Sequence, residues 1–105
     1  MKLKNILLEI INFYSAECIV VIDDQTNISS TLNKIRAIKN VVTIRVVDDI
    51  ERDRFHSKVR IKFLSSTDPL SDIEKIKSDI LTSDEDLKIK GVLNFKIFPN
   101  SITKI

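Results

Sequence analysis

The same order of apolar and polar residues occurs in two stretches of the chain, IKNVVTIRVV at residues 38–47 and IKGVLNFKIF at residues 89–98. Asn40 and Gly91 take the same place in the two stretches. Asn and Gly are the residues that most readily adopt the left-handed backbone conformation that ends a helix. Each stretch is therefore predicted to hold the end of a helix, a left-handed stop and a β-strand.

Further elements are predicted on both sides of each copy. Residues 16–22 form a nearly continuous apolar run, typical of a central strand, and residues 58–64 alternate as in a strand with one buried face. Apolar residues at helical spacing follow each of these strands, from Ile28 in the first half and from Pro69 in the second. In the strands of the two copies, the predicted inward residues are Val42, Ile44 and Val46, and Leu93, Phe95 and Ile97.

The order of these elements is β-α-β-β-α-β over residues 15–98. Right-handed crossovers then predict an α+β fold, a ferredoxin-like sandwich whose antiparallel sheet has the strand order 4-1-3-2, with both helices on one face. Residues 99–105 are expected to be a C-terminal tail. The second face of the sheet would be left open to a partner.

An amphipathic helix is predicted before this domain, over residues 1–14. Its apolar stripe consists of Leu3, Ile6, Leu7, Ile10 and Tyr14, with charged and polar residues elsewhere. No stretch approaches the roughly twenty apolar residues of a membrane span, so no membrane partner is expected.

Composition excludes several classes of protein. The chain has 105 residues, enough for one domain. Its net charge is only +2, which is too small for the overall charge to indicate a nucleic-acid partner. One cysteine excludes an internal disulfide framework and fits a reducing compartment. Only one glycine is present, which argues against phosphate-binding glycine loops.

Candidate catalytic and metal-binding residues are few. His56 is the only histidine and lacks the partners that metal or triad chemistry requires. Cys18 lies within an apolar strand, where a thiol is usually buried and inert. The acidic pairs at residues 23–24 and 48–49 are better explained by capping and solubility than by a calcium loop. We therefore expect no enzyme activity, no cofactor and no metal site.

Four basic residues are predicted on the open face of the sheet, around an apolar centre formed by Ile19 and Val21. They are Arg45, Arg60, Lys62 and Lys96. Such a face could bind nucleic acid, as the sheet of RNA-recognition domains does, but the central strands are predicted to show no outward aromatic residue. A protein partner is therefore the first prediction and nucleic acid the alternative.

The strand-helix-strand over residues 19–47 resembles ACT-type regulatory domains, with residues 32–41 as the best-matching stretch. The resemblance implies pairing through sheets and amino-acid binding at the interface, although the glycine that this family commonly carries after its first strand is absent from residues 23–27. Heavy-metal-associated domains share the fold but carry paired cysteines that this chain lacks. The preference of the chain for Ile, Lys, Asn and Asp, together with the added N-terminal helix, also resembles small phage proteins.

The sequence thus predicts a non-catalytic protein-interaction or assembly module. It would form a homo-oligomer or dock to a larger complex through the sheet face, a sheet edge or the stripe of Leu3, Ile6, Leu7 and Ile10. The alternatives are a nucleic-acid-binding module and an ACT-like small-molecule sensor. The expected location is cytoplasmic, or virion-associated for a viral protein.

Overall fold

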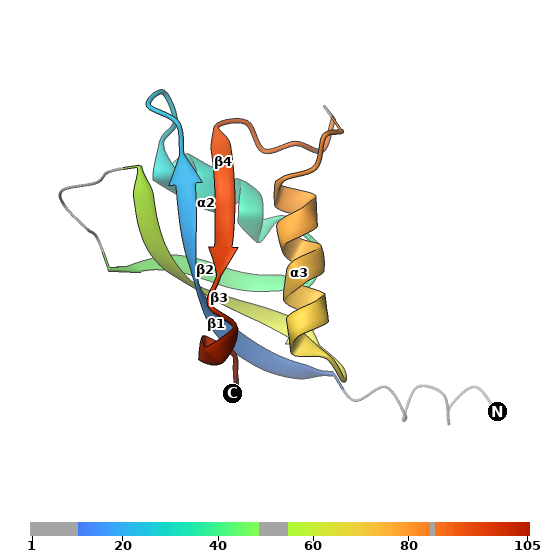
Figure 1. The fold of residues 1–105 in the computed structure, drawn as a ribbon. Coiled ribbons are helices and arrows are strands. Elements are labelled where there is room, and N and C mark those ends of the chain that lie inside the picture. The colour runs from blue at the N-terminus through green and yellow to red at the C-terminus, as the bar shows by residue number, and fades with distance from the viewer. Residues whose placement is uncertain (1–10, 49–54, 85) are drawn as a thin grey trace.

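A computed structural model of the chain describes residues 11–48, 55–84 and 86–105. They form an α+β fold with an antiparallel sheet and two α-helices (Figure 1). The elements are β1 (Asn12–Ile22), α2 (Ile28–Arg36), β2 (Val41–Asp48), β3 (His56–Ser65), α3 (Pro69–Ile80), β4 (Val92–Ile97), the 3₁₀ turn η1 (Pro99–Ser101) and β5 (Thr103–Lys104).

The strand order of the sheet is β2-β3-β1-β4, and every pair of neighbours is antiparallel. This order is consistent with the predicted order 4-1-3-2. Burial alternates along β1 and β3, so that Cys18 and Val20 face the core from β1 while Ile61 and Phe63 face it from β3. The buried residues of both helices belong to the same cluster, which places α2 and α3 against one face of the sheet.

Both helices begin as their sequences indicate. The Asn27 side chain accepts a hydrogen bond from the Ser30 backbone at the start of α2, and Asp68 does the same for Ser71 at the start of α3. Pro69 occupies the first turn of α3, where a missing backbone N–H costs nothing. Apolar residues at helical spacing then face the sheet: Leu32 and Ile35 from α2, and Ile73, Ile76 and Ile80 from α3.

The two stop residues have the predicted backbone conformation, but the prediction that each stretch holds the end of a helix is wrong, because α2 ends at Arg36 and α3 at Ile80. Asn40 has φ 74° and Gly91 has φ 87°, and each directly precedes an edge strand. The Asn40 carbonyl accepts a hydrogen bond from the Leu64 backbone at 2.9 Å, and the Gly91 carbonyl accepts one from Asp23 at 2.8 Å. Each stop residue therefore ties its edge strand to the neighbouring central strand.

The inward residues of the two edge strands were predicted incorrectly at one position each. A β-bulge follows each stop residue, because Val42 and Leu93 are extra residues in the pairing with β3 and β1. Both side chains are exposed, Leu93 by 66%. Val41 and Val92 take the core-facing positions instead, and the expected alternation resumes at Ile44 and Phe95, which are fully buried. Val46 lies on the predicted core side, opposite the buried Val59, but is exposed at the sheet edge.

The predicted N-terminal helix over residues 1–14 is wrong at its end, because β1 begins at Asn12. Tyr14 lies opposite Phe63 in β3, and the two rings stack with their centroids 6.1 Å apart. The position of Tyr14 fits both the two-residue alternation of a strand and the apolar stripe of a helix. Pairing with β3 favours the strand. The rest of that stripe, Leu3, Ile6, Leu7 and Ile10, lies outside the described residues.

Residues 99–105, predicted to be a tail, are part of the fold. The η1 turn leads to β5, which pairs with Tyr14 and Ser15 of β1 beyond the end of β4. The Ile105 backbone donates a hydrogen bond to the Phe13 carbonyl at 2.9 Å. The early start of β1 provides the edge to which this segment is added.

Candidate interaction surface

The open face of the sheet is the side turned away from α2 and α3. Cross-strand pairing identifies its residues, because directly opposite side chains share a face. β1 contributes Phe13, Ser15, Glu17, Ile19 and Val21; β3 contributes His56, Lys58, Arg60, Lys62 and Leu64; the outer strands contribute Thr43, Arg45, Asn94, Lys96 and Thr103.

All four predicted basic residues lie on the open face. Arg45 is directly opposite Arg60, Lys62 is opposite both Thr43 and Ser15, and Lys96 is opposite Ile19. The structure thus brings Arg45, Arg60 and Lys62 together across β2 and β3, with Lys96 on the other side of the half-buried Ile19. An apolar centre between basic groups is the predicted arrangement.

Glu17 balances part of this charge. Its carboxylate lies 3.0 Å from the Arg60 guanidinium and 3.3 Å from the Lys58 ammonium. Hydrogen bonds from Arg60 and then Lys58 lower the pKa of Glu17 below its usual value. Among the described residues, no carboxylate pairs with Arg45, Lys62 or Lys96.

The directly opposed Arg45 and Arg60 are unfavourable for the sheet itself, because like charges on facing residues repel. Glu17 offsets this for Arg60 only. Arg45 is exposed, so water screens much of the repulsion. An anionic group bound between these side chains would remove the repulsion that remains.

A hollow of about 560 Å³ lies where the open face meets the C-terminal segment. Its walls carry Arg60 and Lys62 from β3, Ser15 from β1 and Thr103 from β5. Ser101 holds the segment in place, because its hydroxyl accepts a hydrogen bond from the Glu17 backbone at 2.7 Å and donates one to the Phe98 carbonyl at 2.6 Å. Glu17 also lines the hollow and is paired with Arg60, so Lys62 and the hydroxyl groups are the lining groups left to bind anionic oxygens.

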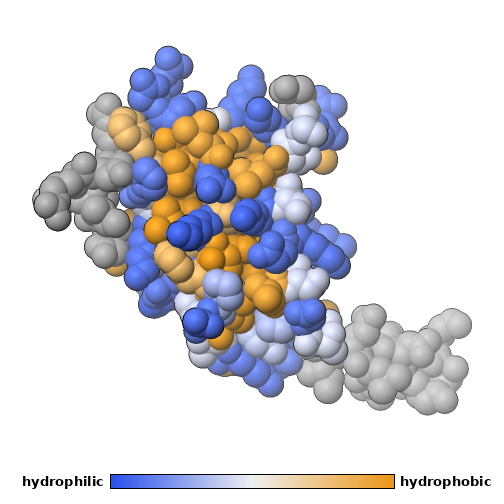
Figure 2. All heavy atoms as spheres, in the orientation of Figure 1, coloured by the Kyte–Doolittle hydropathy of each residue, from blue (hydrophilic) through white to orange (hydrophobic). Residues whose placement is uncertain are grey.

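Phe13 was missed as a surface residue because it was assigned to the N-terminal helix. It lies on β1 opposite Leu64, and its side chain is 49% exposed. Phe98 at the other end of the face lies under the Lys96 ammonium, which is 5.9 Å from the ring centroid. Figure 2 shows hydrophobic groups gathered over the part of the view that β1 and β4 occupy in Figure 1, with hydrophilic groups among them.

The two edges of the sheet are poorly suited to adding another strand. β2 has two irregularities in its pairing with β3, around Val42 and Val47, and β4 begins with the bulge at Leu93. Bulged edges and outward charges are common devices against edge-to-edge association. Of the three predicted docking routes, the edges are therefore the least favoured, and the stripe of Leu3, Ile6, Leu7 and Ile10 lies outside the described residues.

Side chains suited to metal binding are dispersed in the described part of the chain. No cluster of three or more His, Cys, Asp or Glu residues suited to a metal occurs in residues 11–48, 55–84 and 86–105. Cys18 is fully buried, and desolvation raises the pKa of its thiol to about 12. Among the same residues, no helix is long and apolar enough to cross a membrane.

Comparisons of this chain with protein-family models, with curated proteins and with solved structures find no match. The ACT-like resemblance and the resemblance to small phage proteins therefore stay predictions.

Proposed function

We propose that this protein is a non-catalytic interaction module with a ferredoxin-like fold, and that it docks to a larger complex through the open face of its sheet. The observation that carries this proposal is the composition of that face. Half-buried Ile19 and Val21 occupy its centre, and around them lie Arg45, Lys62 and Lys96, three cations that pair with no carboxylate of the described residues. Apolar burial at the centre would supply affinity, and the cations would set orientation.

The charge of the face selects the kind of partner. Among its described side chains, five are Lys or Arg, namely Arg45, Lys58, Arg60, Lys62 and Lys96, and one, Glu17, is acidic. Pairing two copies face to face would bring these cations together, which costs free energy. We therefore infer a partner with acidic groups around an apolar patch, and we place any self-association of this chain on another surface.

Single-stranded nucleic acid is the second candidate, and Phe13 is the observation that favours it. An exposed ring on a sheet face is a stacking platform for a base, and phosphates could reach the cations and hydroxyls of the hollow beside Arg60 and Lys62. The centre of the face is aliphatic, however, where RNA-recognition sheets carry their aromatic rings. This difference makes protein the first candidate.

A charge-matched pair of variants tests the proposal. The face variant carries Arg45→Gln, Lys62→Gln and Lys96→Gln, and the control carries Lys34→Gln, Lys75→Gln and Lys88→Gln on the exposed helical side. Both lose three positive charges, so they differ only in the side of the molecule that is changed. Proteins captured from a nuclease-treated lysate should be lost with the face variant and retained with the control.

A further variant, Phe13→Ala, separates the two candidates. Binding of a labelled oligothymidylate over a range of salt concentrations should be weak and unaffected by Phe13→Ala when the partner is a protein. Tight, strongly salt-dependent binding that Phe13→Ala reduces would assign the face to nucleic acid instead. Equal capture by the wild type, the face variant and the control would contradict an interaction role for this face.

A further inference from the structure

The edge strand β4 has backbone groups that point away from the sheet. In an antiparallel pair, residues that exchange backbone hydrogen bonds alternate with residues whose N–H and C=O groups point outward. The Phe98 backbone N–H donates to the Glu17 carbonyl of β1 at 3.0 Å. Followed back along the register from this bond, the alternation turns the N–H and C=O of Ile97 and Phe95 outward, whereas those of Lys96 face β1.

The other edge strand, β2, has the same arrangement at the equivalent position. The Leu64 N–H donates to the Asn40 carbonyl at 2.9 Å, and Val42 is an extra residue in the register that follows. The alternation across this bulge turns the N–H and C=O of Ile44 outward. Ile44 and Phe95 have the same place in the two copies of the repeated stretch.

At both positions, a polar side chain of the same chain already bonds one of the outward groups. The Asn94 side-chain oxygen accepts a hydrogen bond from the Phe95 N–H at 2.8 Å. The Arg36 guanidinium at the end of α2 donates one to the Ile44 carbonyl at 2.7 Å, and Asn33 accepts a second bond from the same guanidinium. Each edge is therefore capped, on an N–H group in β4 and on a C=O group in β2.

The N–H group that Asn94 bonds is one that a second copy of the chain would need. Two β4 strands paired antiparallel about a two-fold axis at Phe95 would exchange N–H···O=C bonds between their two Phe95 residues. Lys96 of each strand would then lie opposite Asn94 of the other, so the pairing would not bring cations directly opposite one another. The β4 edge thus fits a second copy of itself, and the Asn94 cap competes with that pairing.

We propose that Asn94 and Arg36 cap the edges of the sheet and so keep copies of this chain from pairing strand to strand, with a second β4 as the occupant of the edge that Asn94 blocks. An uncapped edge strand presents backbone groups that template association. Both caps are side chains, so single substitutions remove them without altering the pairing within the sheet. This inference goes beyond the proposed function, which concerns the open face.

Sedimentation equilibrium of matched variants of the full-length chain tests the cap on β4. Asn94→Val removes the acceptor for the Phe95 N–H. Thr43→Val is the control, because Thr43 has the equivalent place in the first copy, lies on the same open face and makes no side-chain hydrogen bond within the described residues. The Asn94→Val variant should self-associate at least several-fold more tightly than the wild type, and the control should match the wild type.

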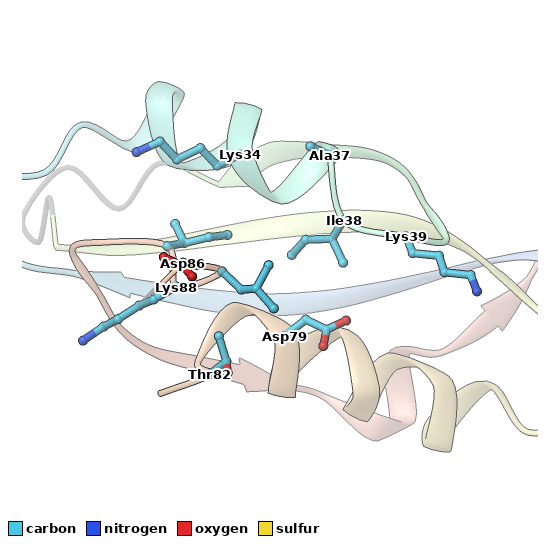
Figure 3. Close-up of a pocket in the computed structure, with 10 residues that line it drawn as sticks. Lys34, Ala37, Ile38, Lys39, Asp79, Thr82, Asp86 and Lys88 are labelled. Carbon is cyan, nitrogen blue, oxygen red and sulfur yellow. The ribbon is translucent and has the colours of Figure 1, made fainter. Parts of the chain in front are cut away.

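A second pair of variants tests the cap on β2. Arg36→Met removes the donor to the Ile44 carbonyl, and Lys34→Met, also on α2, is its control. Both lose one positive charge, but Lys34 lines a cavity of about 520 Å³ whose walls also carry Asp79 of α3, and Figure 3 shows the Lys34 side chain extending toward one end of that cavity. Self-association should increase with Arg36→Met and stay at the wild-type level with Lys34→Met.

Amide hydrogen exchange at Phe95 gives a concentration-dependent readout that a change in stability alone would not produce. At low protein concentration, this amide should exchange at least several-fold faster in Asn94→Val than in the wild type, because its acceptor is gone. Raising the concentration should slow the exchange again, because the second β4 then bonds the same N–H. Thr43→Val should leave the exchange at Phe95 unchanged.

Each other outcome contradicts the proposal. Equal association of Asn94→Val and Thr43→Val would assign the effect to added apolar surface on the open face. Faster exchange at Phe95 without tighter association would show that the cap does not restrain the edge. Unchanged exchange would show that Asn94 does not hold this N–H in solution.

Discussion

The two copies of the repeated stretch agree in structure more closely than in sequence, and they differ in what precedes them. Each has a left-handed residue, then a core-facing valine, an exposed bulge residue and a fully buried residue, Ile44 or Phe95. The first copy follows α2 after the short turn of residues 37–40, whereas the second follows α3 after a connection over residues 81–91. The local backbone conformation is therefore specified by the repeated residues themselves and not by the helix before them.

The largest expected difference in stability is between the buried and the bulged position of the second copy. Phe95→Ala removes a fully buried aromatic side chain and should lower the free energy of unfolding by about 3–5 kcal/mol. Leu93→Ala, two residues earlier, changes an exposed bulge residue and should cost less than about 0.5 kcal/mol. Urea unfolding measures both. A similar cost for the two variants would mean that Leu93 is buried and that the bulge is absent.

The next largest expected difference in stability is between alanine substitutions at the two stop residues. Gly91→Ala should destabilise the protein by about 3 kcal/mol, because φ is 87° and an added Cβ would lie 1.8 Å from the Thr26 hydroxyl oxygen. Asn40→Ala meets only the unfavourable backbone conformation and should cost about 1 kcal/mol.

Two further variants separate the cost of the positive φ from the cost of the steric clash with Thr26. Asn40→Gly should be nearly neutral in urea unfolding, since glycine adopts the same conformation without strain. In a Thr26→Gly background, Gly91→Ala should cost about as much as Asn40→Ala, because the collision is removed and only the strain remains. An unchanged cost in that background would show that Thr26 is not what distinguishes the two sites.

The sequence predicted those features that depend on residue type and short spacing. Asn40 and Gly91 were identified because few residues tolerate positive φ, and the strand order followed from the order of the elements together with the handedness of crossovers. Arg60 and Lys62 were placed correctly on the open face because alternation within β3 has no interruption between Lys58 and Leu64.

Features that depend on pairing between distant strands were missed. The bulges at Val42 and Leu93 arise where an edge strand leaves its stop residue and joins its neighbour, and neither residue has a side chain that indicates an extra position. The strand at Asn12–Tyr14 fits helical spacing as well, so only β3 and β5 distinguish the alternatives. Phe13 was lost from the candidate surface for this reason.

The smallest expected effect concerns the cations on the two edge strands. Arg45 in the first copy faces Arg60, and Lys96 in the second copy faces Ile19, so the copies differ in the charge they meet across the sheet. Glu17 compensates on the side of the first copy only, through Arg60 and Lys58. The Arg45→Gln variant should therefore be neutral or slightly stabilising, whereas Lys96→Gln loses the contact with the Phe98 ring.

The pH dependence of unfolding isolates the contribution of the Glu17 carboxylate to the free energy of unfolding. Because the folded-state pKa of Glu17 is lowered, its contribution is fully present above the ordinary glutamate value of 4.5 and is lost as the pH falls through the lower folded-state pKa. Glu17→Gln should therefore reduce the loss of stability below pH 4.5 and change little above it beyond a constant offset. Urea unfolding at several pH values measures the difference, and added salt should shrink it because the group is exposed to solvent. An unchanged acid slope in the variant would show that Arg60 and Lys58 do not hold the carboxylate in solution, and the repulsion between Arg45 and Arg60 would then have no internal counterion.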